Sequence, residues 1–201
     1  IALSSYLVYY SLPIYHKIEG MLNIFDGGMK ELGTAAKSRE YEVILMGYSH
    51  LGFNLLKAFN KAKKNYLIID FNPEVINNLS KKGISCIYGD VNDSEFINEL
   101  KLSKADIIIS TISDFETNIS VLKKIGDKKV IFIPTSHNIE ESIKLYEFGA
   151  DYVIIPNLLG GDFMANLLVK DNFEKNKIML EGKKQLKEFK ERIMHGHHPR
   201  K

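Results

Sequence analysis

Through the middle of the chain, short runs rich in Val and Ile alternate with stretches whose apolar residues recur at helical spacing. The short runs are almost continuously apolar, which is typical of strands buried on both faces of a parallel sheet. Strand and helix alternate six times, so the pattern predicts an α/β fold with a doubly wound parallel six-stranded sheet. The expected strands are residues 41–46, 66–70, 85–89, 106–110, 129–134 and 151–156, and the expected helices are residues 51–63, 73–82, 94–102, 115–125, 139–148 and 158–169.

The first part of the chain has a different pattern. Residues 1–25 open with an uncharged, Tyr-rich run and continue with apolar residues at helical spacing. They predict the end of a membrane helix followed by an amphipathic helix, and a buried helix of a soluble domain is the alternative. Because the chain opens on Ile1 and not on Met, we expect a membrane domain upstream. Residues 26–40 contain three glycines among scattered charges and predict a linker.

The last part of the chain, residues 170–201, predicts a charged helical tail. Leu186, Phe189 and Ile193 fall on one stripe of this helix. A docking or dimerising helix and a solvated tail are both compatible with this pattern. The histidines at the very end lie in a polar terminus, so we expect no metal site there.

Composition excludes some classes of protein. The formal net charge is +2, which is too balanced for a nucleic-acid-binding protein with a dominant basic face. Cys86 is the single cysteine, so no disulfide framework is possible and a reducing compartment is indicated. In its short apolar run, Cys86 is expected to be a buried, small apolar residue.

The first expected strand ends in a glycine turn that carries candidate chemistry. Gly47 ends the strand and Gly52 begins the helix, which approaches the dinucleotide fingerprint G-x-G-x-x-G with Ser49 at its middle position. Asp70 ends the second strand about 20 residues on, where a carboxylate accepts ribose hydroxyls. The Cβ of Ser49 narrows the space for a pyrophosphate while its hydroxyl can donate to one phosphate. His50 either faces the phosphate or is exposed to solvent. The alternative to a nucleotide site is a turn that needs its glycines only for its backbone conformation.

Further polar residues follow the third and fourth strands. Asp90 comes after the third strand, and Thr111 and Ser113 come after the fourth, all at the edge where ligands bind in open parallel sheets. Helix capping is the alternative role for such residues, and it accounts for Asp93 and Asp114. Capping does not account for Asp90, which stays a ligand candidate.

Several motifs in order resemble the RCK (regulator of potassium conductance) nucleotide-binding domain: "VILMGYSHLG", "LIIDFNPE", "GISCIYGDVND", "ADIIISTISDFETN" and "GADYVIIP". The resemblance covers residues 41–169, and the upstream segment resembles the end of the last membrane helix of Kef-like monovalent cation:proton antiporters. It implies a homodimer on the cytoplasmic side of the cell membrane, with an adenine nucleotide as ligand. The nucleotide site that the resemblance implies comprises Gly47, Ser49, Gly52, Asp70, Asp90 and Thr111. The further candidate binding residues are His50, Phe71, Val91 and Ser113.

One departure from the family pattern bears on the ligand. The family often carries an arginine after its fifth strand, but the run "IPTSHN" has none. AMP is therefore favoured as the ligand, with NAD(H) or ATP as alternatives.

Three functions fit the sequence to different extents. The first is a cytoplasmic regulatory domain of a potassium or sodium/proton antiporter, gated by the nucleotide. The second is an RCK subunit or domain of a Trk- or Ktr-type potassium transporter or of a potassium channel. The third, an NAD-dependent oxidoreductase, would need a substrate domain and a general acid or base, and the charged tail does not supply them. The sequence thus favours a sensor over an enzyme, with no nucleic acid as partner.

Overall fold

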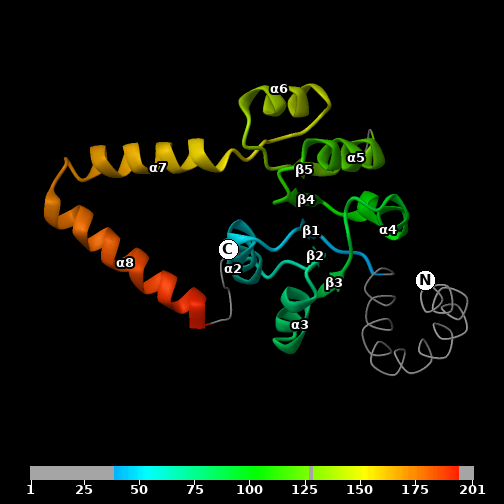
Figure 1. The fold of residues 1–201 in the computed structure, drawn as a ribbon, viewed down its shortest axis with the longest axis horizontal. Helices are drawn as coiled ribbons and strands as arrows, with labels where there is room; N and C mark the ends of the chain where they lie inside the picture. Colours follow the sequence, from blue (N-terminus) through cyan, green and yellow to red (C-terminus); the bar gives the residue numbers. More distant parts are fainter. Residues whose placement is uncertain (1–38, 127–128, 195–201) are drawn as a thin grey trace, which may run out of the picture.

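The computed structural model of the protein describes residues 39–126 and 129–194 (Figure 1). The expected membrane-helix end, the amphipathic helix, the histidine-containing terminus and all but Arg39 and Glu40 of the expected linker lie outside the described residues. Among the helices of the described part, none is both long and apolar enough to cross a bilayer.

The described part of the chain forms an α/β fold around a parallel sheet, which confirms the predicted fold class. The strand order is β3-β2-β1-β4-β5, and every neighbouring pair is parallel. This is the order of a doubly wound nucleotide-binding sheet. The strands are β1 (Val43–Met46), β2 (Tyr66–Asp70), β3 (Cys86–Tyr88), β4 (Ile107–Ser110) and β5 (Ile131–Ile133).

The prediction of a sixth strand is wrong. Residues 151–156 contribute only an isolated parallel bridge, between Thr135 and Ile154. The ladder is interrupted because Pro134 has no N–H to donate to this segment. The segment still forms backbone hydrogen bonds, from the Asp151 N–H to the Phe132 carbonyl oxygen at 3.1 Å and from the Ile154 N–H to the Pro134 carbonyl oxygen at 2.8 Å. The N–H of Val153 donates to the Tyr146 hydroxyl at 3.0 Å. The predicted strand is therefore an irregular edge segment beside the end of β5.

The expected helices are present, with changed bounds. Residues 94–102 do not form one helix, because Leu100 is extended and separates a short α-helix from a 3₁₀ turn. Leu100 and Leu102 are both buried, and two residues that far apart would point to different sides of a continuous helix. The helices are α2 (His50–Lys61), α3 (Pro73–Lys81), α4 (Ser94–Glu99), η1 (Leu102–Lys104), α5 (Phe115–Ile125), α6 (Ile139–Glu147), α7 (Pro156–Lys170) and α8 (Lys175–Met194).

Helices cover both faces of the sheet, as the continuous apolar strands predict. Ile44 and Met46 of β1 pack toward a cluster that includes residues of α4, α5 and α6. Val43 and Leu45 point to the opposite face and pack against α2 and α3. All four side chains are buried, so β1 is the centre of the core.

The last two helices form an arm outside this core. In Figure 1, α7 leads away from the sheet and α8 turns back toward α2. No residue of α7 is buried, although several of its side chains are large and apolar. The two helices meet at Asn172 and Phe173, which adopt left-handed backbone conformations. The arm is therefore attached to the body by few contacts.

The turn from β1 into α2 depends on Gly47. Its φ is +82°, and a Cβ added there would lie 2.7 Å from Oγ1 of Thr111. Gly83 also has a positive φ, of +70°, but an added Cβ would meet nothing within 4 Å. An alanine at Gly47 would therefore meet both backbone strain and steric overlap, whereas an alanine at Gly83 would meet backbone strain alone.

We predict that Gly47→Ala lowers the free energy of unfolding by about 2–4 kcal/mol, since left-handed strain and overlap with Thr111 add together. The matched control, Gly83→Ala, has the backbone strain alone and should lose about 1–2 kcal/mol. Urea unfolding of both variants measures the difference. Equal losses would show that the contact with Thr111 does not constrain the turn.

A second prediction concerns Cys86, which is partly buried and not fully buried as the sequence suggests. Its thiol donates to the Ile76 carbonyl oxygen, with 3.6 Å between Sγ and O, and burial raises the pKa of the thiol to about 11. At pH 8 roughly 0.1% of it would be thiolate, against about a quarter of a free thiol with pKa 8.5. A disulfide reagent should therefore react at least about tenfold more slowly with the native protein than with the unfolded chain. Equal rates would contradict the burial of this thiol.

Candidate functional site

The glycine turn, Asp70 and Thr111 come together at one edge of the sheet. Met46, the last residue of β1, lies in register with Ile69 of β2 on one side and with Ser110 of β4 on the other. The next residues along these three strands are Gly47, Asp70 and Thr111. They meet at the carboxyl ends of the central strands, which is the edge predicted from the sequence.

The loop after β1 leads directly into the amino end of a helix. Ser49 is the N-cap of α2, which begins at His50, and the Ser49 side chain makes no capping hydrogen bond. Both residues are exposed. The first-turn N–H groups of a helix favour an anion, and α2 has no acidic residue there to oppose one.

Gly52 allows this helix to approach the sheet closely. A Cβ at Gly52 would lie 3.2 Å from the Tyr48 ring, 3.3 Å from the carbonyl oxygen of Gly47 and 3.4 Å from Leu45. These distances are tighter than most contacts that real Cβ atoms make. The glycine therefore has the packing role that its place in the motif predicts.

Thr111 braces the turn from the neighbouring strand. Its backbone N–H donates to the Met46 carbonyl oxygen at 2.8 Å, and its hydroxyl donates to the Gly47 carbonyl oxygen at 3.0 Å. The Thr111 side chain thus orients the loop backbone, and this is a structural role beside the predicted role in ligand binding.

Asp70 has a structural role that the sequence analysis did not include. One carboxylate oxygen accepts from the Tyr48 N–H and the other from the Asn72 N–H, both at 2.7 Å. The residue is only 5% exposed. Asp70 is not the cap of α3, because the Asn72 side chain accepts from the Glu74 N–H. Each carboxylate oxygen has a second lone pair, so acceptor capacity is left for a ribose hydroxyl.

The remaining predicted site residues differ in how far their side chains are accessible. Asp90 is exposed, but one carboxylate oxygen accepts from the Asn92 N–H at 2.9 Å, so an Asx turn accounts for part of its role. Val91 is 4% exposed and belongs to the core, so its side chain is not at the surface of the site. Phe71 follows Asp70 and is 54% exposed. Ser113 is partly buried.

The predicted helix caps are confirmed. The Asp93 side chain accepts from the Glu95 N–H, and the Asp114 side chain accepts from the Thr117 N–H. The hydrogen bond from the Thr117 hydroxyl, followed by the bond from its N–H, lowers the pKa of the Asp114 carboxyl.

Two further side chains join the ends of β4 and β5. Thr135 donates from its hydroxyl to the Ser110 carbonyl oxygen at 2.7 Å. The fully buried Asn118 donates from Nδ2 to the carbonyl oxygens of Ile112 and Thr135. Asn118 falls within the expected helix 115–125, and nothing in the pattern predicts that it holds two loops together.

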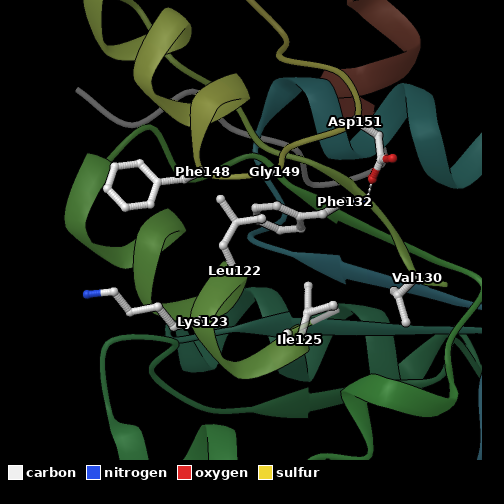
Figure 2. Close-up of a pocket in the computed structure, with 9 residues that line it drawn as sticks. Leu122, Lys123, Ile125, Val130, Phe132, Phe148, Gly149 and Asp151 are labelled. Atoms are coloured by element: carbon white, nitrogen blue, oxygen red, sulfur yellow. Dashed lines mark hydrogen bonds between the residues drawn. The ribbon is translucent and has the colours of Figure 1, made fainter. Parts of the chain in front are cut away.

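A cavity of ≈ 410 Å³ lies at the opposite edge of the sheet, near the amino end of β5 (Figure 2). Its charged lining side chains are Lys123 and Asp151, and the Asp151 carboxylate already accepts from the Phe132 N–H at 2.8 Å. The cavity lies at the other end of the strands from the glycine turn, so it is not part of the candidate site. It is lined by Leu122, Lys123, Ile125, Gly126, Val130, Phe132, Phe148, Gly149 and Asp151.

Comparison with solved structures supports the fold. The TrkA-N domain of inner membrane protein ybaL from Escherichia coli superposes with a TM-score of 0.59 at 20% identity, covering 65% of this chain and 98% of that one. The Kef C-terminal domain of Shewanella denitrificans, solved in an AMP-bound form, gives a TM-score of 0.53 at 11% identity, with coverage of 77% and 94%.

Comparison of sequences adds the family. The chain is 23% identical over 146 residues to Potassium channel protein 1 of Methanocaldococcus jannaschii, an alignment that covers 70% of this chain and 44% of the relative. The chain thus spans less than half the length of that relative. The model of the family described as TrkA-N domain matches residues 43–156, which is more than half of the 201 residues. The chain therefore belongs to the TrkA-N (RCK) family that its motifs resemble.

Proposed function

We propose that this chain is the nucleotide-sensing regulatory domain of a potassium or sodium/proton antiporter of the Kef-like kind, placed on the cytoplasmic side of the cell membrane. The observation that carries the proposal is the convergence of the Gly47 turn, the amino end of α2 and the Asp70 carboxylate at one edge of the sheet. A sensor needs a ligand site and a way to transmit occupancy, and not a catalytic base.

AMP is the proposed ligand, and each of its parts has a partner at this edge. The N–H groups of the loop and of the first turn of α2 would hold one phosphate. The second lone pairs of the Asp70 oxygens would accept from the ribose hydroxyls. The exposed ring of Phe71, next in sequence to Asp70, offers a flat apolar surface for the adenine. Solved neighbours hold different adenine nucleotides, AMP in the Kef C-terminal domain and NAD or ADP in the GsuK channel, so they support an adenine nucleotide as the class of ligand. The preference for AMP rests on the sequence of this chain, which has Ser49 in place of the middle glycine and no arginine in the run after the fifth strand.

Gating requires that AMP bind two arrangements of the domain with different affinity. A ligand can shift such an equilibrium only by its differential binding free energy, which is typically about 1–3 kcal/mol. In the proposed function, the two arrangements are two ways in which the domains of a dimer sit against each other. Residues 26–40 would connect each domain to a membrane domain in the same chain.

A homodimer is the proposed assembly, and α7 is its proposed contact. A 15-residue helix without one buried residue leaves a large apolar surface in water. Packing of α7 against a second copy would remove part of this apolar surface from water on both protomers. The exposed residues are Leu158, Leu159, Phe163, Met164 and Val169.

A potassium-channel regulatory domain is the second candidate, favoured by the archaeal channel relative. The two functions differ in what the nucleotide controls in the full-length protein. Potassium flux coupled to proton flux in vesicles would support the antiporter, whereas uncoupled potassium conductance would support the channel.

The ligand prediction is tested by changing the ligand, because removing the Asp70 carboxylate would also leave two backbone N–H groups unpaired. In titration calorimetry we expect AMP to bind about tenfold more tightly than 2′-deoxy-AMP, since one hydrogen bond to a carboxylate is lost. Adenosine, without the phosphate, should also bind at least about tenfold more weakly than AMP. Equal affinity for AMP and 2′-deoxy-AMP would contradict the placement of the ribose at Asp70.

The assembly prediction is tested on α7. Phe163→Glu puts a charge on the exposed apolar surface and should convert a dimer to a monomer at roughly tens of micromolar, as judged by light scattering. Asn157→Glu puts the same charge at a position of α7 that is already polar and should leave the dimer intact. A monomeric wild type, or a dimeric Phe163→Glu variant, would contradict this interface.

A further inference from the structure

The C-terminal end of α8 rests on α2 through one arginine. The Arg192 guanidinium donates to the Asn54 side-chain oxygen at 2.6 Å and to the His50 carbonyl oxygen at 3.4 Å. Within α8 it also donates to Glu188 at 2.9 Å. The Arg192 side chain is only 14% exposed, so much of its surface is covered by this contact.

An aromatic ring and a second ion pair complete the contact. The Arg192 guanidinium lies 4.9 Å from the centre of the Phe53 ring, and the ammonium group of Lys57 lies 4.8 Å from the same centre. Lys57 also faces Glu188, with 3.8 Å between Nζ and Oε1. We call this set of residues the α8 clasp: His50, Phe53, Asn54, Lys57, Glu188 and Arg192.

The clasp is weak enough to open. Its ion pairs are partly exposed, and such pairs typically contribute about 0–1 kcal/mol each. The Nε of Arg192 is buried without a hydrogen-bond partner, which opposes docking. Because no residue of α7 is buried, α7 adds little to hold α8 against the body. The position of α8 therefore depends on the clasp.

The clasp also lies on the helix that begins at the candidate phosphate site. His50, whose carbonyl oxygen accepts from Arg192, is the first residue of α2. Residues 47–53 contain no Lys or Arg, so the guanidinium from α8 brings a positive charge that the loop itself lacks. Burial raises the pKa of the Tyr48 hydroxyl to about 12, and the positive charge of Arg192 acts in the opposite direction. The charge of Arg192 is therefore felt at a side chain of the loop.

We propose that Arg192 makes α8 a sensor of the nucleotide phosphate: the docked helix strengthens phosphate binding, and a bound phosphate strengthens docking of the helix. This inference rests on the proposed function. The reason is electrostatic: the guanidinium contacts the carbonyl oxygen of His50, the first residue of α2, so an anion at the amino end of α2 would lie near it, and charges interact over about 8 Å in physiological salt. The two effects must be equal in free energy, because coupling between two binding events is reciprocal.

The first test compares AMP with adenosine in calorimetry of the whole chain. Arg192→Gln should weaken AMP binding by roughly threefold to tenfold, in line with an interaction across partly screened space, and should change adenosine binding less than about twofold. Lys190→Gln removes the same charge from an exposed position of α8 and should change neither affinity. Arg192→Lys keeps the charge and should recover part of the loss.

The second test reads the position of α8 itself. Spin labels on cysteines introduced at Lys61 of α2 and Lys190 of α8 report the distance between the helices, and Cys86→Ser prevents a third label. AMP should narrow the distance distribution and adenosine should not. In the Arg192→Gln background, AMP should have no effect on the distribution.

The outcomes separate the two proposals. A wild type that binds no adenine nucleotide refutes the proposed function, and the inference falls with it. A wild type that binds AMP while Arg192→Gln binds it equally well refutes the inference alone. Equal losses for AMP and adenosine in Arg192→Gln would also refute it, because the effect would then not act through the phosphate.

Discussion

One buried carboxylate connects the parts of the candidate site. Asp70 ends β2, and its two oxygens accept from the N–H groups of Tyr48 and Asn72. The first of these groups belongs to the loop after β1 and the second to the start of α3, so a single side chain sets the separation of two loops. Thr111 adds a third point from β4, through its bond to the Gly47 carbonyl oxygen. The geometry that a nucleotide would meet is thus fixed by hydrogen bonds within the protein, before any ligand binds.

This arrangement explains why the turn tolerates little change. Gly47 needs a positive φ and also borders the Thr111 hydroxyl, and Gly52 lies against the Tyr48 ring. The loop is therefore constrained by backbone conformation, by packing and by hydrogen bonds at once. A preorganised site of this kind loses less conformational entropy on binding than a flexible loop would.

The sequence predicted those features that depend on local chemistry. The glycine turn, the acid at the end of β2 and the caps Asp93 and Asp114 follow from short motifs whose residue types allow few alternatives. The prediction of a sixth strand was wrong because an apolar run shows burial but not pairing, and Pro134, directly after β5, lacks the N–H donor that a continuous ladder needs.

The features that the sequence did not predict depend on contacts between distant residues. The bonds of Asp70 to backbone N–H groups carry no signal in the pattern, since any acid at that position would read as a ligand. Arg192 lies 138 residues from Asn54 along the chain. The sequence left a docking helix and a solvated tail open for this segment, and nothing in its pattern distinguishes Arg192 from the other charged residues. Arg192 lies beside α2 because of the directions in which α7 and α8 run, and the spacing of apolar residues along a sequence does not predict the direction of a helix.

The central claim is that an adenine nucleotide binds at the carboxyl edge of the sheet, on the loop between β1 and α2. Hydrogen exchange of the backbone amides, followed with and without saturating AMP, tests it most directly. The account predicts slower exchange at residues 48–53 in the presence of AMP, and unchanged exchange around the cavity at the opposite edge, at residues 122–126 and 130–132. Unchanged exchange at residues 48–53, or slowing confined to the opposite edge, would contradict it.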